Sequence, residues 1–315
     1  MVGIAGAGGA GLAALLPLTT WPGAFAGSVL LWTSTTLGPV MSARVMAGAS
    51  RDVMARSMGA LLAASFIGST VASPFAGALA AGFGTRVPLA VGVAAFALAA
   101  VPLVMLGPPP ERPAARGPVL PRRLWPILAV VPLAAFVAAL PIPLLPLYLR
   151  DIAAIPLERV GLHVALMGVG TAIFAFVSGR VADAFGTAAA VLMDGAILAL
   201  GAVALVLLAG SEIALALAIV LVGANLALLP VLTAAVEPHL SVARRAAGAA
   251  ALGFAFGLGA SAASVLAGTL YEVDAALPYL ATAALALPVT TMLAVAIARV
   301  ARSGTGIPVL RSDPT

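Results

Sequence analysis

Residues 179–186 read Gly179-Arg180-Val181-Ala182-Asp183-Ala184-Phe185-Gly186 and form a short polar interruption between two long apolar runs. Each run has about twenty residues, the length that a helix needs to cross a bilayer. A chain that reverses direction in so few residues needs glycine where the backbone is left-handed or closely approached, so Gly179 and Gly186 are predicted to make the turn. A carboxylate at the edge of the hydrocarbon is costly without a cation or a helix N-terminus. We therefore expect Asp183 to have such a partner.

The composition identifies the broad class of protein. Of the 315 residues, 63% are hydrophobic and only 9% are charged, and the mean hydropathy is +1.17. These values lie far outside the range of soluble globular domains. The chain is therefore predicted to be an all-α integral membrane protein that crosses the bilayer several times.

The same composition argues against several other functions. There is no cysteine for a disulfide or a thiolate ligand, and the two histidines lie far apart in sequence, so no metal site is expected. The basic residues stand singly or in pairs between apolar runs, unlike the basic clusters of nucleic-acid-binding surfaces. No paired carboxylates or histidine clusters suggest an enzyme, and no cofactor is expected.

Apolar runs of about twenty residues predict ten membrane-spanning helices. They cover residues 3–18, 23–43, 57–81, 87–106, 124–147, 160–181, 188–209, 213–236, 247–270 and 276–297. Pro141, Pro143 and Pro146 predict that the fifth of these bends or ends early. The longest connection, 107–123, is rich in proline and arginine and divides four helices from six.

The arginines predict the orientation, because short cytoplasmic loops collect basic residues. With a cytoplasmic N-terminus, all 16 basic residues except Arg86, Arg150 and Arg159 fall on the inside. An even number of helices then puts both termini in the cytoplasm. We expect a multi-pass protein of the cell membrane, surrounded by the lipid bilayer and monomeric.

Four short matches recur in the same order at an offset of about 190 residues, which indicates an internal repeat. The matches pair Pro39-Val40-Met41-Ser42-Ala43 with Pro230-Val231-Leu232-Thr233-Ala234, Arg56-x-x-Gly59 with Arg245-x-x-Gly248, Ser73-x-x-Ala76-Gly77 with Ser264-x-x-Ala267-Gly268, and Pro88 with Pro278. The chain is thus predicted to hold two copies of one unit. These are an N-terminal half-bundle over 1–106 and a six-helix bundle over 124–300, joined by a cytoplasmic linker over 107–123 and followed by a tail over 301–315.

The motif at 179–186 resembles a loop signature of the major facilitator superfamily of secondary transporters, Gly-x-Leu-Ala-Asp-Arg-x-Gly-Arg-Arg. Gly179, Asp183 and Gly186 match it, whereas the expected basic residues are replaced by Ala184, Thr187 and Ala188. The resemblance implies two pseudo-symmetric bundles. In the family's twelve-helix plan this chain resembles helices three to twelve.

The resemblance also implies a gating role for Gly179, Arg180, Asp183 and Gly186. In the family this loop touches the helix that opens the cytoplasmic end of the other bundle. Here that helix is expected to begin near Arg56 and Ser57, whose free N–H groups and charge would attract Asp183.

Ser73, Pro74 and Gly77 resemble a degraded form of the glycine-rich fifth-helix motif of drug:proton antiporters. The family pattern has Gly-Pro and a Gly-Gly pair, and this chain has Ser-Pro and Gly-Ala. The alternative is a proline kink with close packing of small residues.

Polar residues within or beside the apolar runs are candidates for proton or substrate binding. Asp194 is the only carboxylate well inside an apolar run; it is a candidate for proton coupling or for a structural pairing near the interface. His163, at an outer helix end, is a second candidate for coupling. Asn225, with Pro39 and Pro230, lies on helices that the resemblance assigns to the cavity and is a candidate for substrate binding or interhelical hydrogen bonding. We expect Asn225, and not Asp194, to face the cavity between the bundles.

These features favour secondary transport of a small solute by alternating access. No nucleotide motif is found, so an ion gradient, with protons as the candidate ion, is expected to supply the energy. The cavity helices carry almost no charge, which favours efflux of an apolar or amphipathic compound over transport of an anion. The rival hypothesis is a truncated, non-transporting fragment of such a transporter, or a start codon placed too far downstream.

Overall fold

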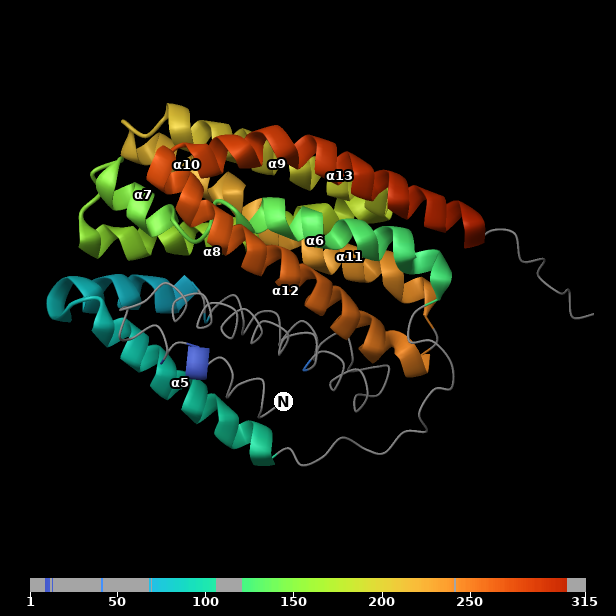
Figure 1. Cartoon of the computed structure of the whole chain (residues 1–315), viewed down its shortest axis with the longest axis horizontal. Helices are drawn as coiled ribbons and strands as arrows, with labels where there is room; N and C mark the ends of the chain where they lie inside the picture. Colours follow the sequence, from blue (N-terminus) through green and yellow to red (C-terminus); the bar gives the residue numbers. More distant parts are fainter. Residues whose placement is uncertain are drawn as a thin grey trace, which may run out of the picture.

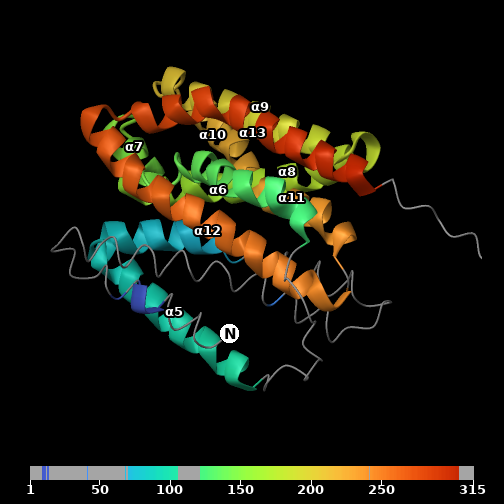
Figure 2. The same cartoon turned by 45° about the vertical axis from the view of Figure 1, so that its right-hand side comes forward.

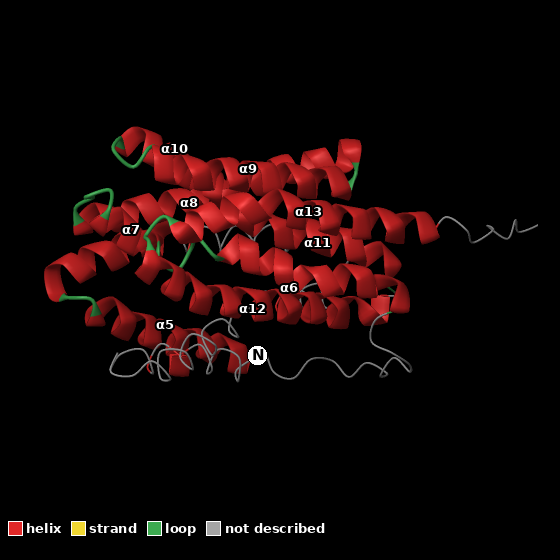
Figure 3. Ribbon diagram, turned by 45° about the horizontal axis from the view of Figure 1, so that its top comes forward, coloured by secondary structure: helices red, strands yellow, loops and turns green. Residues whose placement is uncertain are grey.

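The structure, a computed structural model, describes residues 9–11, 13, 41, 68, 70–105, 121–240 and 242–304. Within these ranges the chain forms helices and the turns that join them, without a strand (Figure 3). Most residues of the spans predicted at 3–18 and 23–43 lie outside the described residues, as do Pro39 and residues 57–67 and 69 of the span at 57–81.

Six described stretches are long and apolar enough to cross a membrane. They are Arg122–Ala139, Leu157–Phe185, Thr187–Leu207, Glu212–His239, Ala247–Val273 and Leu277–Arg302. One stretch corresponds to each span predicted between residues 124 and 300. Two shorter apolar helices precede them, Thr70–Phe83 and Arg86–Val101, the second forming most of α5 (Arg86–Met105).

The helices that follow α5 gather into one body, here called the C-terminal bundle, which comprises residues 121–304 (Figures 1 and 2). Its α-helices are α6 (Trp125–Ala139), α7 (Leu145–Asp151), α8 (Leu157–Phe185), α9 (Thr187–Leu207), α10 (Glu212–Val222), α11 (Leu228–Val236), α12 (Val242–Val273) and α13 (Leu277–Gly304). Short 3-10 segments occur at η1 (Arg122–Leu124), η2 (Gly223–Ala227) and η3 (Glu237–His239). The helix Thr70–Phe83 and α5 lie beside this body, and Thr70–Phe83 contacts the start of α8.

The surface of the bundle is apolar where a soluble protein would be polar. Phe176 is 62% exposed and Ile213 is 79% exposed, although both belong to long apolar helices. Exposed apolar area on this scale would cause aggregation in water but suits contact with lipid tails. The core beneath it is apolar and includes Leu205, Leu215 and Ile219.

The predicted span 124–147 ends early, as its prolines indicate. α6 stops at Ala139, the chain turns through residues 140–144, and α7 begins at Leu145. Pro141 and Pro143 lack the N–H that would continue the helical hydrogen bonds, and Pro146 takes a first-turn position of α7, where its missing N–H costs nothing.

The motif at 179–186 forms a helical hairpin whose turn is a single residue. α8 continues to Phe185 and α9 begins at Thr187, so only Gly186 stands between them. Gly186 has φ of +89°, a left-handed conformation that glycine adopts without strain. The expectation that Gly179 also makes the turn is wrong, because Gly179 lies inside α8 with open space at its Cβ position.

The span predicted as one helix over 213–236 is broken in the middle. The α-helical hydrogen bonding of α10 gives way at Gly223 to the 3-10 segment η2, and α11 follows. At the break, the carbonyl oxygen of Gly223 accepts a hydrogen bond from the Thr171 hydroxyl of α8 at 2.9 Å. A 3-10 segment inside a long helix commonly marks a hinge or a functional site.

Candidate functional site

A small cavity lies inside the C-terminal bundle, where α6, α9, α13 and the broken η2–α11 segment meet. Its lining comprises Ala134, Val137, Ala138, Asp194, Gly195, Leu198, Ala224, Asn225, Leu228, Ala286, Val289 and Thr290. Most of these residues are apolar. The polar groups of Asp194, Asn225 and Thr290 therefore determine what the cavity can bind.

Asp194 projects from the second turn of α9 into this interior and is only 3% exposed. One carboxyl oxygen, Oδ1, accepts a hydrogen bond from the Ser178 hydroxyl of α8 at 2.5 Å. The other oxygen, Oδ2, is buried and accepts no hydrogen bond from the described residues. A buried carboxyl with a single neutral donor is costly in its ionised form.

Asn225 lies on η2 at the break between α10 and α11 and is 2% exposed. Its amide Nδ2 donates to the carbonyl oxygen of Ala138 on α6 at 2.9 Å, while its Oδ1 is buried without a donor among the described residues. The Nδ2 bond links the broken helix to α6. It is the interhelical hydrogen bond predicted from the sequence as the alternative to substrate binding.

The expectation that Asn225 faces a cavity between the bundles while Asp194 does not is wrong. Both residues line the same cavity, and the described residues of its walls belong to helices of the C-terminal bundle. The sequence argument placed Asp194 beside the membrane surface because it stands two turns from the hairpin. Close packing of α8 and α9 behind Gly186 instead buries the second turn of α9.

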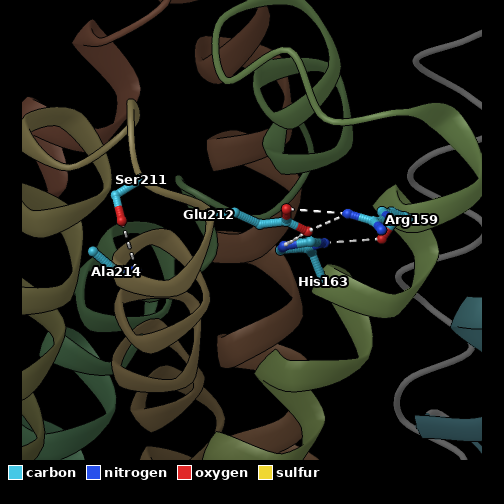
Figure 4. Close-up of polar contacts among 5 residues, drawn as sticks. All are labelled: Arg159, His163, Ser211, Glu212 and Ala214. Carbon is cyan, nitrogen blue, oxygen red and sulfur yellow. Dashed lines mark hydrogen bonds and ion pairs between the residues drawn. The ribbon is translucent and has the colours of Figure 1, made fainter.

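Charged residues gather at the opposite end of α8, at what we call the α7 end of the bundle: α7 and the first turns of α8 and α10. One guanidinium nitrogen of Arg159 lies 3.2 and 3.1 Å from the two carboxylate oxygens of Glu212 (Figure 4). Arg159 and Glu212 are 57% and 46% exposed. On α7 the hydrogen bond from Arg150 lowers the pKa of the exposed Asp151.

His163 lies between these charges, with its side chain 5% exposed. Its Nδ1 is 3.0 Å from the carbonyl oxygen of Arg159, which can only accept, so Nδ1 carries a hydrogen. Its Nε2 is 3.6 Å from Glu212 Oε1. The ring therefore joins the first turn of α8 to the first turn of α10. Within the described part of the chain, no group of three or more His, Asp or Glu side chains could hold a metal ion.

A larger cavity of about 400 Å³ separates the helix Thr70–Phe83 from the C-terminal bundle at the α7 end. Ser73, Gly77, Arg150 and Gly161 lie on its walls, which are otherwise mainly apolar. Beside the cavity the two sides touch through their backbones. A Cβ on Gly161 would lie 3.0 Å from Pro74 Cα and 3.1 Å from Gly77 Cα, and it would overlap the carbonyl oxygen of Ser73.

The remaining candidate residues lie apart from both cavities. Asp183 is exposed near the end of α8, and Arg180 lies over the ring of Phe176, 4.4 Å from its centroid. Arg56 and Ser57, the expected partners of Asp183, are outside the described residues, so that contact stays a prediction. Pro230 is exposed on α11, and its repeat partner Pro39 is not described.

The sequence argument missed Ser178 and Glu212, the partners of Asp194 and His163. Ser178 and Asp194 stand equally far from Gly186 in sequence, on opposite sides of it. In a helical hairpin with a one-residue turn, residues at equal distances from the turn lie side by side. Their equal spacing from Gly186 could therefore have predicted that Ser178 and Asp194 pair. Nothing comparable relates Glu212 to His163, because their pairing depends on how α10 packs on α8.

An all-helical bundle with a lipid-compatible surface, a broken helix and a cavity between two helical groups is typical of membrane transport proteins. Residues 127–308 match the sequence model of the Major Facilitator Superfamily. The match covers more than half of the chain, so the protein belongs to the Major Facilitator Superfamily. The fold class predicted from the sequence is confirmed, and the protein is a multi-pass membrane transporter.

Solved structures of transporters resemble the fold. A nucleoside transporter, NupG (D323A mutant), aligns with a TM-score of 0.64 and 16% identity over 95% of this chain and 82% of its own. A bacterial homologue of the iron transporter ferroportin, in an outward-facing state with soaked iron, aligns with a TM-score of 0.56 and 13% identity over 95% of this chain and 80% of its own. In its inward-facing state the values are 0.56 and 15%, over 94% and 80%. No curated protein sequence matches the chain.

Proposed function

We propose that the protein exports small apolar or amphipathic compounds across the cell membrane in exchange for protons, by alternating access. The observation that carries the proposal is the cavity of about 400 Å³ between the helix Thr70–Phe83 and the C-terminal bundle. Pockets of this size suit drug-sized ligands, and mainly apolar walls with a few polar groups favour apolar or amphipathic ones. Arg150 is the one charged residue among the described residues of this lining.

The contact beside that cavity supports a rocking motion of the two helical groups. Gly77 and Gly161 allow the backbones of Thr70–Phe83 and α8 to meet without side chains between them. Such a contact can separate and re-form as rigid units, because no interlocked side chains have to repack. Ser73, Pro74 and Gly77 also occupy the stretch that resembles the antiporter motif, which favours exchange with protons.

The distribution of charge supports an orientation with the α7 end outside. Arg122, Arg123 and Arg180 lie at the other end of the bundle, as do Arg299 and Arg302 in the last turns of α13. Basic residues collect on the cytoplasmic side of membrane proteins. In this orientation both termini are cytoplasmic. We also propose that the protein acts as a monomer.

The hairpin at Gly186 is then cytoplasmic, and we assign it a part in closing that side. Asp183 is exposed there and free to meet a partner on the N-terminal half. A helix N-terminus stabilises a carboxylate by roughly 0.3–2 kcal/mol, enough to shift a two-state equilibrium. Gly186 makes the turn of this hairpin, and we include Gly179 and Arg180, in the last turns of α8, in the proposed gate.

Filling the cavity tests the proposed binding site. Val164 lines the cavity from α8, whereas Leu162 on the same helix is 54% exposed on a different face. Val164→Trp is expected to reduce transport of an amphipathic fluorescent dye in proteoliposomes at least tenfold, with Leu162→Trp as the matched control. Equal transport by the two variants would remove this cavity from the pathway.

The proton requirement is tested in the same proteoliposomes. An imposed pH gradient is expected to drive dye movement, and a protonophore is expected to abolish it. Dye movement that continues unchanged without any proton gradient would contradict exchange with protons while leaving the cavity assignment intact.

A further inference from the structure

The interior cavity of the C-terminal bundle holds two polar oxygens that lack hydrogen-bond donors. Asp194 Oδ2 and Asn225 Oδ1 are both buried, and neither accepts a hydrogen bond from the described residues. They come from different helical segments but line the same space. The space open to the centre of a water molecule is about 10 Å³, roughly what one water needs.

Two acceptors facing one small cavity repel each other electrostatically and leave desolvated lone pairs. Buried polar groups in native proteins are nearly always satisfied, so a pair of orphan acceptors indicates a missing donor. An ionised Asp194 would worsen the imbalance by placing a full negative charge opposite the amide oxygen. A proton on Asp194 Oδ2 turns one acceptor into a donor and removes the conflict.

Among the described residues, no basic group is placed to neutralise an ionised Asp194. The lining residues from α6, η2, α11 and α13 are uncharged, and from α8 the facing group is the Ser178 hydroxyl. Arg180 and Asp183 of α8 lie toward the exposed hairpin, and Arg299 and Arg302 lie in the last turns of α13. Glu212, the one charged residue of α10, is bonded to Arg159 at the α7 end.

We propose that Asp194 binds a proton on Oδ2. The resulting O–H group donates a hydrogen bond to Asn225 Oδ1, either directly or through one enclosed water molecule. Ser178 completes the site by donating to Oδ1. This proton-binding site joins α8, α9 and the broken η2 segment inside the C-terminal bundle, apart from the cavity assigned to the exported compound. The inference concerns proton binding alone and holds whether or not export is coupled to protons.

Loss of the proton would have a defined structural consequence. The charged Asp194 would require water or a cation, and the cavity has room for about one water molecule. The adjoining segment is the 3-10 break that carries Asn225, so deprotonation would favour opening of the bundle at this hinge. Proton binding thereby stabilises the closed packing of η2 against α6 and α9.

Infrared spectroscopy of the purified protein in lipid nanodiscs tests the site without any transport measurement. At neutral pH the wild-type spectrum is expected to contain the C=O stretch of one protonated carboxylic acid, and Asp194→Asn is expected to remove it. Glu158→Gln, which alters an exposed carboxylate of α8, is the matched control and is expected to keep the band. Ser178→Ala is expected to shift the band, because the donor to Oδ1 is lost.

A second measurement covers the possibility that Asp194→Asn does not fold. In the wild-type protein alone, the acid band should shift on exchange into D₂O. The folded protein holds a proton that the unfolded chain releases, so stability falls as the pH rises above the range in which a free aspartate titrates. The unfolding equilibrium constant should increase up to tenfold per pH unit there.

Absence of the acid band at neutral pH would overturn the proposal. If Na⁺ at the same time raises the melting temperature of wild type but not of Asp194→Asn, the cavity binds a cation instead. If neither the acid band nor the Na⁺ effect is found, Asp194 is an ionised and hydrated residue.

Discussion

Two carboxylates of the C-terminal bundle have opposite surroundings. Glu212 at the α7 end is 46% exposed and lies within 3.6 Å of both Arg159 and His163. Asp194 in the interior is 3% exposed and has one hydroxyl as its donor among the described residues. Glu212, which water could solvate, is bonded to the Arg159 guanidinium, whereas the buried Asp194 has no basic partner among the described residues. Glu212 thus links the ends of α8 and α10, and the contrast is the basis of the proposal that Asp194 binds a proton.

The two regions also differ in what holds them together. At the α7 end, the long side chains of Arg159 and Glu212 bridge the first turns of α8 and α10 directly at the exposed surface (Figure 4). In the interior, glycines bring backbones into contact, as at Gly223 against α8. Exposed ion pairs contribute little to stability, while tightly packed backbones tolerate almost no added volume. The loss of unfolding free energy should therefore be largest for substitutions in the interior and smallest for substitutions at the α7 end.

The largest effect is expected at Gly223. A Cβ there would lie 2.7 Å from Thr171 N and 2.9 Å from Gly170 C, and it would overlap the carbonyl oxygen of Met167. These are backbone atoms of α8 and cannot move aside, so Gly223→Ala should cost about 3 kcal/mol of unfolding free energy. Denaturant unfolding in mixed micelles measures this change.

Gly210 provides the control, because no atom lies within 4 Å of its Cβ position. Gly210→Ala should change stability by less than about 0.5 kcal/mol. Similar losses for the two variants would mean that the interior is not packed more tightly than the helix ends.

A smaller effect is expected at Ser178. Ser178→Ala removes the hydroxyl that donates to Asp194 Oδ1 and leaves both carboxyl oxygens without a donor among the described residues. An unsatisfied buried acceptor costs about 1–3 kcal/mol, which should appear as a lower unfolding free energy. Ser211→Ala at the exposed start of α10 breaks a 3.5 Å bond to Ala214 N and should cost about 0.5 kcal/mol. A larger loss at Ser211 would reverse the comparison.

The sequence predicted the helical membrane fold well, because apolar run length and proline positions act locally. The break at Pro141 and Pro143 followed from the missing N–H groups alone. The break at Gly223 did not, since it depends on Thr171 of α8 reaching the Gly223 carbonyl. The helix that bears the 179–186 motif continues to Phe185, beyond its predicted end at residue 181, because Ala182, Ala184 and Phe185 are compatible with a helix.

The candidate sites were predicted less completely than the fold. Asp194 and Asn225 stood out individually as polar residues in apolar runs, and the structure brings them to one cavity. Their juxtaposition depends on α9 and η2 packing against α6 and α13, which no spacing in the sequence encodes. Gly77 was recognised through a motif resemblance, but its contact with Gly161 required the arrangement of two distant helices.

The smallest effect is expected for the Arg159–Glu212 pair. With exposures of 57% and 46%, both side chains remain hydrated, so the attraction between them is screened and partly offset by the entropy of holding two long side chains. A double-mutant cycle of Arg159→Gln and Glu212→Gln should give a coupling free energy of about 0.5 kcal/mol at low salt, falling toward zero at about 1 M salt. The contact of His163 Nε2 with Glu212 at 3.6 Å is altered by Glu212→Gln in both backgrounds, so it cancels from the coupling free energy. A coupling above about 2 kcal/mol that persists in high salt would mean that the α7 end is desolvated like the interior, and the contrast between Glu212 and Asp194 would then fail.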